Sequence, residues 1–97
     1  MAEVRKTAEF DQWVKALRDM RAKSKVLVRI ERLALGNPGD VAPVGEGVSE
    51  MRIDYGPRYR AYFKQTGEVT TFLFGGDKGS QEADIRKAKA LAKDLED

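Results

Sequence analysis

The chain of 97 residues contains no cysteine and no histidine. Without cysteine it has no disulfide bond, no thiolate nucleophile and no zinc site of the usual cysteine type. Without histidine it lacks the commonest general acid–base group and the commonest metal ligand. Any catalysis must therefore use Asp, Glu, Lys, Arg, Tyr, Ser or Thr, and we expect neither a metal site nor a cofactor.

Long apolar runs are also missing. No stretch approaches the roughly 18 consecutive apolar residues of a transmembrane helix, and the first ten residues carry four charges and no apolar segment of the kind found in a signal peptide. The composition, 41% hydrophobic and 35% charged, is typical of a soluble globular protein, and the length suffices for one core. We expect a single cytoplasmic domain over residues 1–97 that does not bind membranes.

The N-terminal part predicts a strand and a helix. Residues 1–6 are expected to form an edge strand. Thr7 is the expected N-cap of a helix that extends to about Ala22. Four apolar residues recur at i, i+3, i+4 and i+7, as on the buried face of an amphipathic helix: Phe10, Trp13, Val14 and Leu17.

A second helix is expected to begin at Ser24 and to pair with the first as a helical hairpin. Its apolar stripe faces away from Arg29 and Arg32. The stripe comprises Leu27, Ile30 and Ala34, widened by Val26 and Leu33. Residues 36–47 hold four glycines and two prolines, which predicts one extended loop.

From residue 48 the apolar period changes to two. Residues 51–55 and 59–63 alternate apolar and polar side chains on either side of a turn at residues 56–58, which predicts a β-hairpin. Residues 69–74 predict a central strand, ended by the glycine-rich residues 75–79, and Ser80 is the expected N-cap of the last helix. The predicted order is β-α-α-β-β-β-α. It is an α+β fold in which the helical hairpin and the C-terminal helix pack on a small, mainly antiparallel sheet.

The polar face of the predicted hairpin is the first candidate site. Arg52, Arg60, Tyr62 and Lys64 are expected to share it. If exposed, this face is a basic platform with an aromatic ring, suited to phosphate contacts and base stacking. The alternative is an ordinary solvated face on which Arg60 forms an ion pair with an acidic neighbour, either Glu50 or Asp54.

The second candidate is the glycine-rich run over residues 75–80, between a strand and a helix. Free backbone N–H groups at a helix N-terminus bind anions, and Lys78 lies near them. The run lacks the spacing of a P-loop. The alternative is a tight glycine turn with Ser80 as its cap.

Several long segments carry a resemblance to a known family. They are residues 9–13 (EFDQW), 32–40 (RLALGNPGD), 45–63 (GEGVSEMRIDYGPRYRAYF) and 72–81 (FLFGGDKGSQ). Together they resemble the HigB-like branch of the RelE/ParE toxin superfamily, bacterial toxins of the addiction module killer type. The resemblance covers nearly the whole chain and implies a RelE-like fold with the element order given above.

The resemblance implies the toxin of a type II toxin–antitoxin system. Its expected activity is cleavage of mRNA at the aminoacyl site of the translating ribosome, as a metal-independent endoribonuclease that arrests translation. Its expected partners are the ribosome, mRNA and a small cognate antitoxin with a helix-turn-helix domain, and the free toxin is expected to be a monomer. The ParE side of the superfamily instead inhibits DNA gyrase without cleaving RNA. The lack of a recognisable acid–base pair favours that non-catalytic alternative.

The same resemblance implies catalytic residues. Arg52 stands on the first hairpin strand where a basic residue is expected, Arg60 ends the Gly-Pro-x-Tyr-Arg motif, and Lys78 follows Gly-Gly-Asp. Tyr55 and Asp77 are further candidates. Similar sequences often have glycine where this chain has Arg58, so the turn gains a charge.

RNA cleavage by internal attack requires that the 2′-hydroxyl lose a proton, that the phosphorane be stabilised and that the leaving 5′-oxygen gain a proton. The hypothesis is that Arg52 and Arg60 hold the scissile phosphate, and that Lys78 or Asp77 assists proton transfer. Tyr55 or Tyr62 stacks on or positions a nucleobase of the RNA. The expected RNA-binding residues are Arg58, Tyr62 and Lys64, with Lys23 and Lys25 on the helical hairpin.

Overall fold

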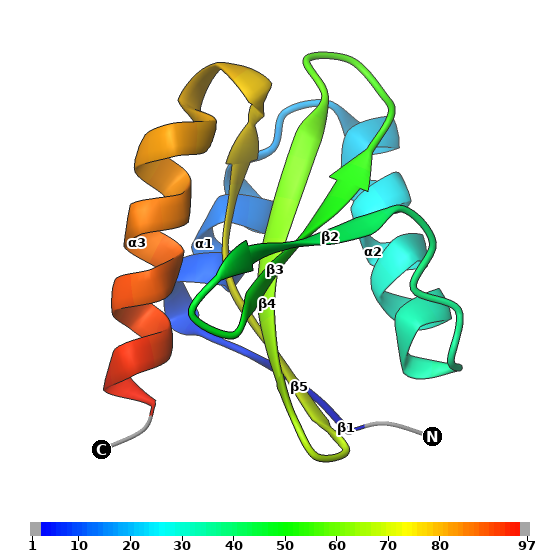
Figure 1. Ribbon diagram of the computed structural model, residues 1–97. Helices are drawn as coiled ribbons and strands as arrows, with labels where there is room; N and C mark the ends of the chain where they lie inside the picture. The colour runs from blue at the N-terminus through cyan, green and yellow to red at the C-terminus, as the bar shows by residue number, and fades with distance from the viewer. Residues whose placement is uncertain (1–2, 96–97) are drawn as a thin grey trace.

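The computed structural model describes residues 3–95 and has an α+β fold (Figure 1). Within these residues no helix is long and apolar enough to span a membrane. The first two residues of the predicted N-terminal strand lie outside the described part. The elements are β1 (Glu3–Lys6), α1 (Ala8–Ala16), α2 (Met20–Ala34), β2 (Val41–Gly45), β3 (Val48–Ile53), β4 (Tyr59–Thr66), β5 (Val69–Asp77), a 3₁₀ turn (Lys78–Ser80) and α3 (Gln81–Asp94).

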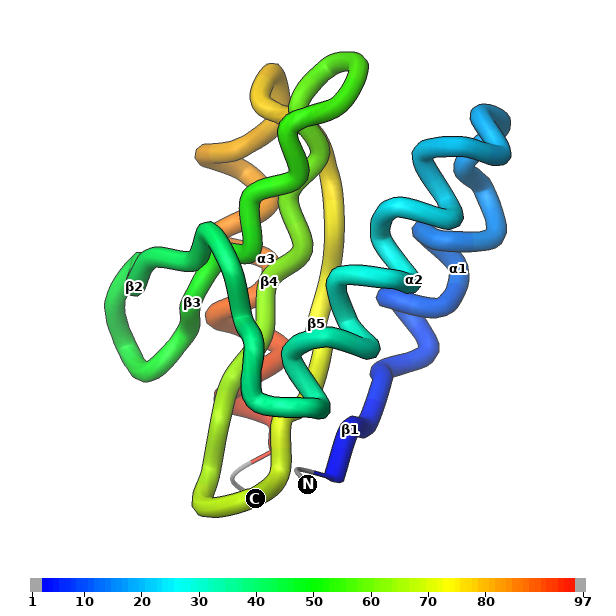
Figure 2. The backbone as a smooth tube through the Cα atoms, turned by 90° about the vertical axis from the view of Figure 1, so that its right-hand side faces the viewer, coloured from blue at the N-terminus to red at the C-terminus, as the bar shows by residue number. Residues whose placement is uncertain are grey.

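The five strands form one sheet in the order β1-β5-β4-β3-β2. β1 runs parallel to β5, and the other neighbours are antiparallel, so the expectation of a mainly antiparallel sheet is confirmed. Helices α1 and α2 cover one face and α3 covers the other, which is clearest in the view turned by 90° (Figure 2). The sheet is therefore the middle of three layers.

The face under α1 and α2 carries the larger apolar core. Phe10 of α1 lies 5.2 Å from Phe72 of β5 between ring centroids, and Phe72 lies 5.4 Å from Phe63 of β4. Met51 and Ile53 of β3 complete the sheet side of this core. The alternation that predicted the hairpin thus places its apolar side chains against the helical pair.

The boundary between the two helices differs from the prediction. Thr7 caps α1 as expected, because its hydroxyl accepts a bond from the Phe10 amide at 3.0 Å. However, α1 ends at Ala16 and not near Ala22. The carboxylate of Asp19 accepts bonds from the first amides of α2, at 2.9 Å from Arg21, so Asp19 and not Ser24 is the N-cap.

The buried stripe of α2 is also shifted from the predicted one. Its buried residues are Ala22, Val26, Ile30 and Leu33. Leu27, which was expected in the stripe, is exposed. Val26, Ile30 and Leu33 of the predicted stripe are buried as expected, whereas Ala34 is only partly buried.

The prediction of one extended loop over residues 36–47 is wrong, because β2 lies within it. Val41 pairs with Met51 and Ala42 with Glu50 in an antiparallel ladder. Pro43 is tolerated because β2 is an edge strand, where an amide is not required for further pairing. The sheet therefore has one strand more than the sequence predicts.

The predicted end of the last strand at residue 74 is also wrong. β5 continues through Gly75 and Gly76 to Asp77. A Cβ atom on Gly75 would lie 2.2 Å from the ring of Trp13, and one on Gly76 would lie 1.7 Å from the carboxylate of Asp84. The two glycines thus allow close packing against a strand and do not end it.

Candidate functional site

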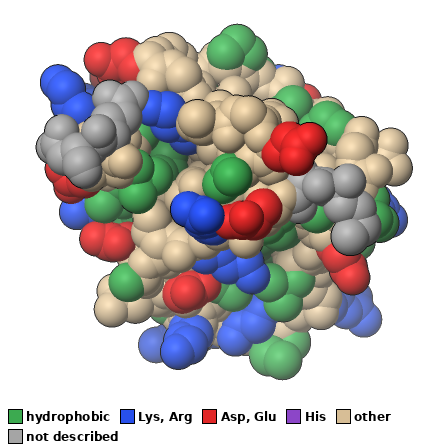
Figure 3. Space-filling model, turned by 90° about the horizontal axis from the view of Figure 1, so that it is seen from below, with side chains coloured by type: hydrophobic (Ala, Val, Ile, Leu, Met, Phe, Trp, Pro, Cys, Tyr) green, Lys and Arg blue, Asp and Glu red, His purple; other side chains and the backbone are tan. Residues whose placement is uncertain are grey.

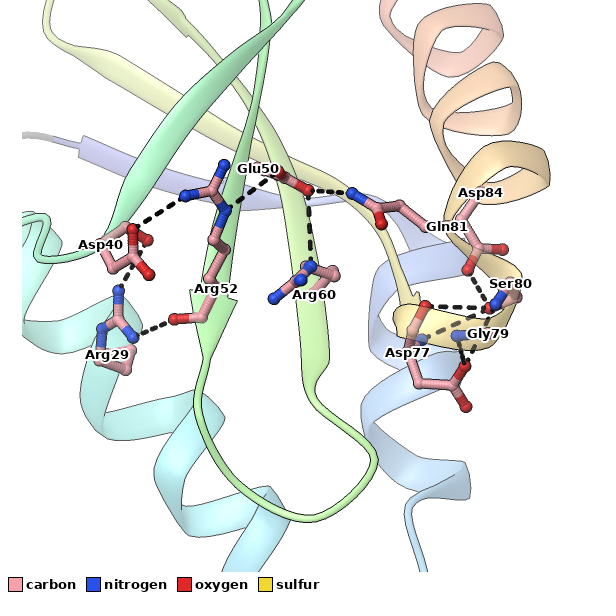
Figure 4. A network of polar contacts seen from close by, with 10 residues as sticks. All are labelled: Arg29, Asp40, Glu50, Arg52, Arg60, Asp77, Gly79, Ser80, Gln81 and Asp84. Atoms are coloured by element: carbon pink, nitrogen blue, oxygen red, sulfur yellow. Dashed lines mark hydrogen bonds and ion pairs between the residues drawn. The ribbon is translucent and has the colours of Figure 1, made fainter.

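The centre of the candidate site is Glu50, a carboxylate that is only 4% exposed in the middle of β3. Arg52 donates from Nε to Oε1 at 3.1 Å, and Gln81, the first residue of α3, donates to Oε2 at 2.9 Å. Nε of Arg60 lies 3.6 Å from Oε2 (Figure 4). The ion pair between Arg60 and Glu50, one of the two interpretations of this face, is confirmed.

The two arginines are brought together by the hairpin register, which pairs Arg52 directly with Arg60. The side chain of Arg52 is 40% exposed and also reaches Asp40 at 3.3 Å. The hydrogen bond and the negative charge of Glu50 raise the pKa of Arg52. The side chain of Arg60 is only 11% exposed, and its Nε atom lacks a hydrogen-bond partner within the described residues.

An open pocket of about 230 Å³ lies at the accessible side of these arginines. It is lined by Asp40, Arg52, Asp54, Arg58 and Arg60. Three guanidinium groups around one pocket suit an oxyanion, because their planar forks match the geometry of phosphate. Arg58 adopts a φ of 63°, in the left-handed region that favours glycine.

Arg29 of α2 supports the pocket from below. Its guanidinium donates to the carbonyl oxygens of Arg52, Pro38 and Asp40, the last two at 3.1 and 3.3 Å. Burial lowers the pKa of Arg29. Arg29 thus ties α2 to β3 and to the segment before β2, and its donors are directed at the backbone (Figure 4).

Tyr55 lies in a different place from the two paired arginines. Its hydroxyl donates to Asp19 at 2.8 Å, and Nζ of Lys25 lies 5.3 Å from the centroid of its ring. The hydrogen bond lowers the pKa of Asp19 and raises that of Tyr55. Tyr55 and Lys25 line a second surface pocket beside the start of α2, and Lys23 is half-buried on the same helix.

Asp77 and Lys78 lie at the end of β5. Asp77 caps the 3₁₀ turn, accepting bonds from the amides of Gly79 at 2.8 Å and Ser80 at 3.2 Å. Asp77 lines a third pocket with the aromatic rings of Trp13 and Tyr59. The exposed Lys78 follows, and its amide donates to the carbonyl of Pro57 in the turn that carries Arg58.

Ser80 does not act as the predicted cap. It stands at the N-cap position of α3, yet its side chain makes no capping bond. Its hydroxyl donates instead to Asp84, one turn along α3. The N–H groups of the glycine-rich turn are already occupied by Asp77, so this turn differs from an open anion-binding N-terminus.

The expectation that Tyr62 lies on an exposed face is wrong. Tyr62 is fully buried under α3, together with Leu73, Ala88 and Ala92. Its hydroxyl has no hydrogen-bond partner within residues 3–95, and burial raises its pKa. A nucleobase of RNA therefore cannot stack on the ring of Tyr62.

Lys64 lies on β4 well away from the paired arginines. It lines another pocket, at the opposite end of the sheet, with Arg5, Lys6 and Leu95. Seen from below, basic and acidic side chains are interspersed over this end of the molecule (Figure 3). Lys64 is thus separated from the arginine pocket.

Sequence reasoning considered Glu50 only as an ion-pair partner and missed Gln81, Asp40 and the lining role of Asp54. A signal for Glu50 exists, because it stands two residues before Arg52 and so shares its face of β3. No local pattern points to Gln81, since it approaches Glu50 from another element 31 positions away.

The chain is 46% identical over 94 residues to an uncharacterized protein of Haemophilus influenzae. It belongs to the same family as that protein. The match covers 96% of this chain and 95% of the relative, so the two share the whole domain and not one motif. No family model and no solved structure matches the chain.

Proposed function

We propose that the chain is the toxin of a bacterial type II toxin–antitoxin system and that it cleaves mRNA on the ribosome without a metal ion. One observation carries the proposal. Three arginines, Arg52, Arg58 and Arg60, line one open pocket on the hairpin that bears the toxin-like motif of residues 45–63. This arrangement suits the scissile phosphate of RNA.

In the proposed reaction the 2′-oxygen attacks the adjacent phosphorus and the bond from phosphorus to the 5′-oxygen breaks. The products are a 2′,3′-cyclic phosphate and a 5′-hydroxyl end. Arg52, Arg58 and Arg60 bind the non-bridging oxygens and stabilise the charge that develops on them. This stabilisation is the main contribution of the pocket.

The proton steps require two further groups. Asp54 is exposed and lines the pocket, so we assign it the role of accepting the 2′-hydroxyl proton. Lys78 follows β5 beside the turn of Arg58, and we assign it the proton given to the 5′-oxygen. Asp77 is a weaker candidate for either step, because one of its oxygens already accepts two backbone bonds. Binding to the ribosome would orient the RNA for in-line attack.

The test is primer extension on a translated reporter mRNA after brief induction, with and without an antibiotic that blocks ribosomes. We expect new 5′ ends inside codons that disappear when ribosomes are blocked. Arg60→Ala should abolish cleavage and growth arrest, whereas the control Arg86→Ala, at an exposed position of α3, should leave both unchanged. A folded Arg60→Ala protein that remains fully toxic would contradict the assignment.

A ParE-like, non-catalytic inhibitor of DNA gyrase is the second candidate. It is favoured by the engagement of Arg52 and Arg60 with Glu50 and of Asp77 with the 3₁₀ turn. It is also favoured because Lys78, the proton donor of the nuclease reaction, is not among the residues that line the pocket. Intact mRNA together with growth arrest and a DNA-damage response would support this candidate over the nuclease.

A further inference from the structure

Glu50 lies behind the arginine pocket and does not line it. Its carboxylate interacts with the Nε atom of each arginine. Arg52 Nε lies 3.1 Å from Oε1, and Arg60 Nε lies 3.6 Å from Oε2. A guanidinium group is rigid and planar, so an interaction at Nε restricts the directions that its two amino groups can take. In Arg52 one of these amino groups, Nη1, lies 3.3 Å from Oδ1 of Asp40, a residue of the pocket lining.

The carboxylate is itself held in place. Gln81 donates to Oε2 at 2.9 Å from the first turn of α3, and the backbone of Glu50 is paired with Tyr62 on β4 and with Ala42 on β2. Glu50 is thus fixed from three neighbouring elements. A group held so firmly can set the orientation of side chains that would otherwise sample many rotamers.

We propose that Glu50 is a positioning residue that orients the guanidinium groups of Arg52 and Arg60 toward a phosphate group in the pocket. The identity of that phosphate as part of an RNA strand rests on the proposed function. Glu50 itself does not take a proton from the substrate, because it is buried and both of its oxygens already accept bonds.

Charge and orientation predict opposite effects of neutralising Glu50. If only charge matters, Glu50→Gln makes the pocket more positive and tightens the binding of an anion. If Glu50 orients the arginines, the same change weakens binding, because the amide presents an N–H group where one guanidinium requires an acceptor. The sign of the change therefore separates the two explanations.

The experiment measures binding of a short single-stranded RNA with 2′-O-methyl groups, which the protein cannot cleave by internal attack, using fluorescence anisotropy. We expect Glu50→Gln to weaken binding by roughly tenfold, the effect of about 1.4 kcal/mol. The matched control is Glu46→Gln, which removes the same charge from an exposed residue paired with Lys89 at 3.7 Å. The control should change affinity less than about twofold.

Glu50→Asp provides a second variant in case the glutamine variant does not fold. It retains the charge but shortens the side chain by one methylene, so an effect of charge alone predicts unchanged affinity. Orientation predicts weaker binding. Circular dichroism and thermal unfolding establish that each variant is folded. A folded Glu50 variant that binds the RNA as tightly as the unaltered protein, or more tightly, overturns the proposal.

A spectroscopic measurement separates this proposal from the proposed function. In the unaltered protein, the Nε–H resonances of Arg52 and Arg60 should shift on addition of inorganic phosphate, and Glu50→Gln should abolish the shift. If the unaltered protein neither binds nor cleaves RNA, the proposed function fails. The phosphate-dependent shift still decides the role of Glu50. Equal shifts in both proteins, or no shift in either, overturn the positioning role.

Discussion

The two faces of the sheet are built from different kinds of side chains. The face under α1 and α2 is apolar and rich in aromatic rings, and Phe72 contacts both Phe10 and Phe63. The face under α3 (Figure 1) has a smaller apolar cluster, and it also buries polar groups, namely Glu50 and the hydroxyl of Tyr62. One face is suited to stability and the other to the geometry of a site.

The difference follows from the energetics of burial. Removing apolar area from water is favourable, whereas a buried carboxylate is tolerated only when donors surround it. Glu50 meets this condition through hydrogen bonds from Arg52 and Gln81 and through the nearby positive charge of Arg60, and in doing so it makes the positions of those side chains interdependent. Substitutions on the two faces should therefore affect different measurements.

The largest expected effect is on the apolar face. Phe72→Ala should lower the free energy of unfolding by about 3–5 kcal/mol, because it removes a fully buried ring and leaves a cavity. The measurement is urea denaturation followed by the fluorescence of Trp13. Leu95→Ala, at a side chain that is more than half exposed, is the control and should change stability by less than about 0.5 kcal/mol. Similar losses in the two variants would contradict the placement of the core.

The next largest effect is a loss of stability where α1 packs closely on β5. Gly75→Ala places a Cβ atom 2.2 Å from the ring of Trp13 and should cost about 1–3 kcal/mol of stability. Gly79→Ala is the control, because the nearest atom to its Cβ is Oδ1 of Asp77 at 3.2 Å, a separation that a shift of a few tenths of an ångström relieves. Replacing Trp13 with leucine in the Gly75→Ala background should recover part of the loss. An undiminished loss in that double variant would rule out the ring contact as the cause.

Replacing Arg58 with glycine should increase stability and weaken RNA binding. Its φ of 63° is unfavourable for a residue with a side chain, so Arg58→Gly should raise the free energy of unfolding by about 1 kcal/mol. The same change removes one of the three cations of the pocket and should weaken the binding of single-stranded RNA. Thermal unfolding and anisotropy measured on the same samples check both signs. Lower stability would show that the turn does not hold residue 58 under strain.

The apolar face of the sheet and the helix that covers it could be predicted from the sequence. The spacing of Phe10, Trp13 and their neighbours and the alternation in residues 51–55 and 59–63 reflect local geometry, and the structure follows them. β2 could not be predicted in the same way, because it is defined by backbone pairing with β3 and not by its own side chains. The break before Met20 depends on one carboxylate, that of Asp19, which pattern reading assigned to a continuing helix.

The candidate site was predictable only where the hairpin creates it. Alternation places Arg52 and Arg60 on one face, and the register brings them together. Alternation does not tell whether that face is covered, so the burial of Tyr62 under α3 was missed. Tyr55 and Asp77 lie in separate pockets, because their neighbours come from α2 and from the 3₁₀ turn, at separations along the chain that no local pattern records.

The smallest expected effect concerns Tyr62 itself. Its ring is fully buried under α3, but its hydroxyl lacks a partner within the described residues. Tyr62→Phe should therefore change the free energy of unfolding by less than about 0.5 kcal/mol near pH 7.

The unaltered protein and the Tyr62→Phe variant should differ in stability at high pH. Burial raises the pKa of Tyr62 in the folded state, so the unfolded chain loses this proton first as the pH rises past about 10. Below that pH the contribution of Tyr62 to stability is fully present, and above it the folded protein loses stability because it resists ionisation. Unfolding curves of the two proteins should therefore separate above pH 10, with the Phe variant the more stable. Curves that remain parallel through this range would show that the hydroxyl reaches water and that the face under α3 is more open than the apolar face.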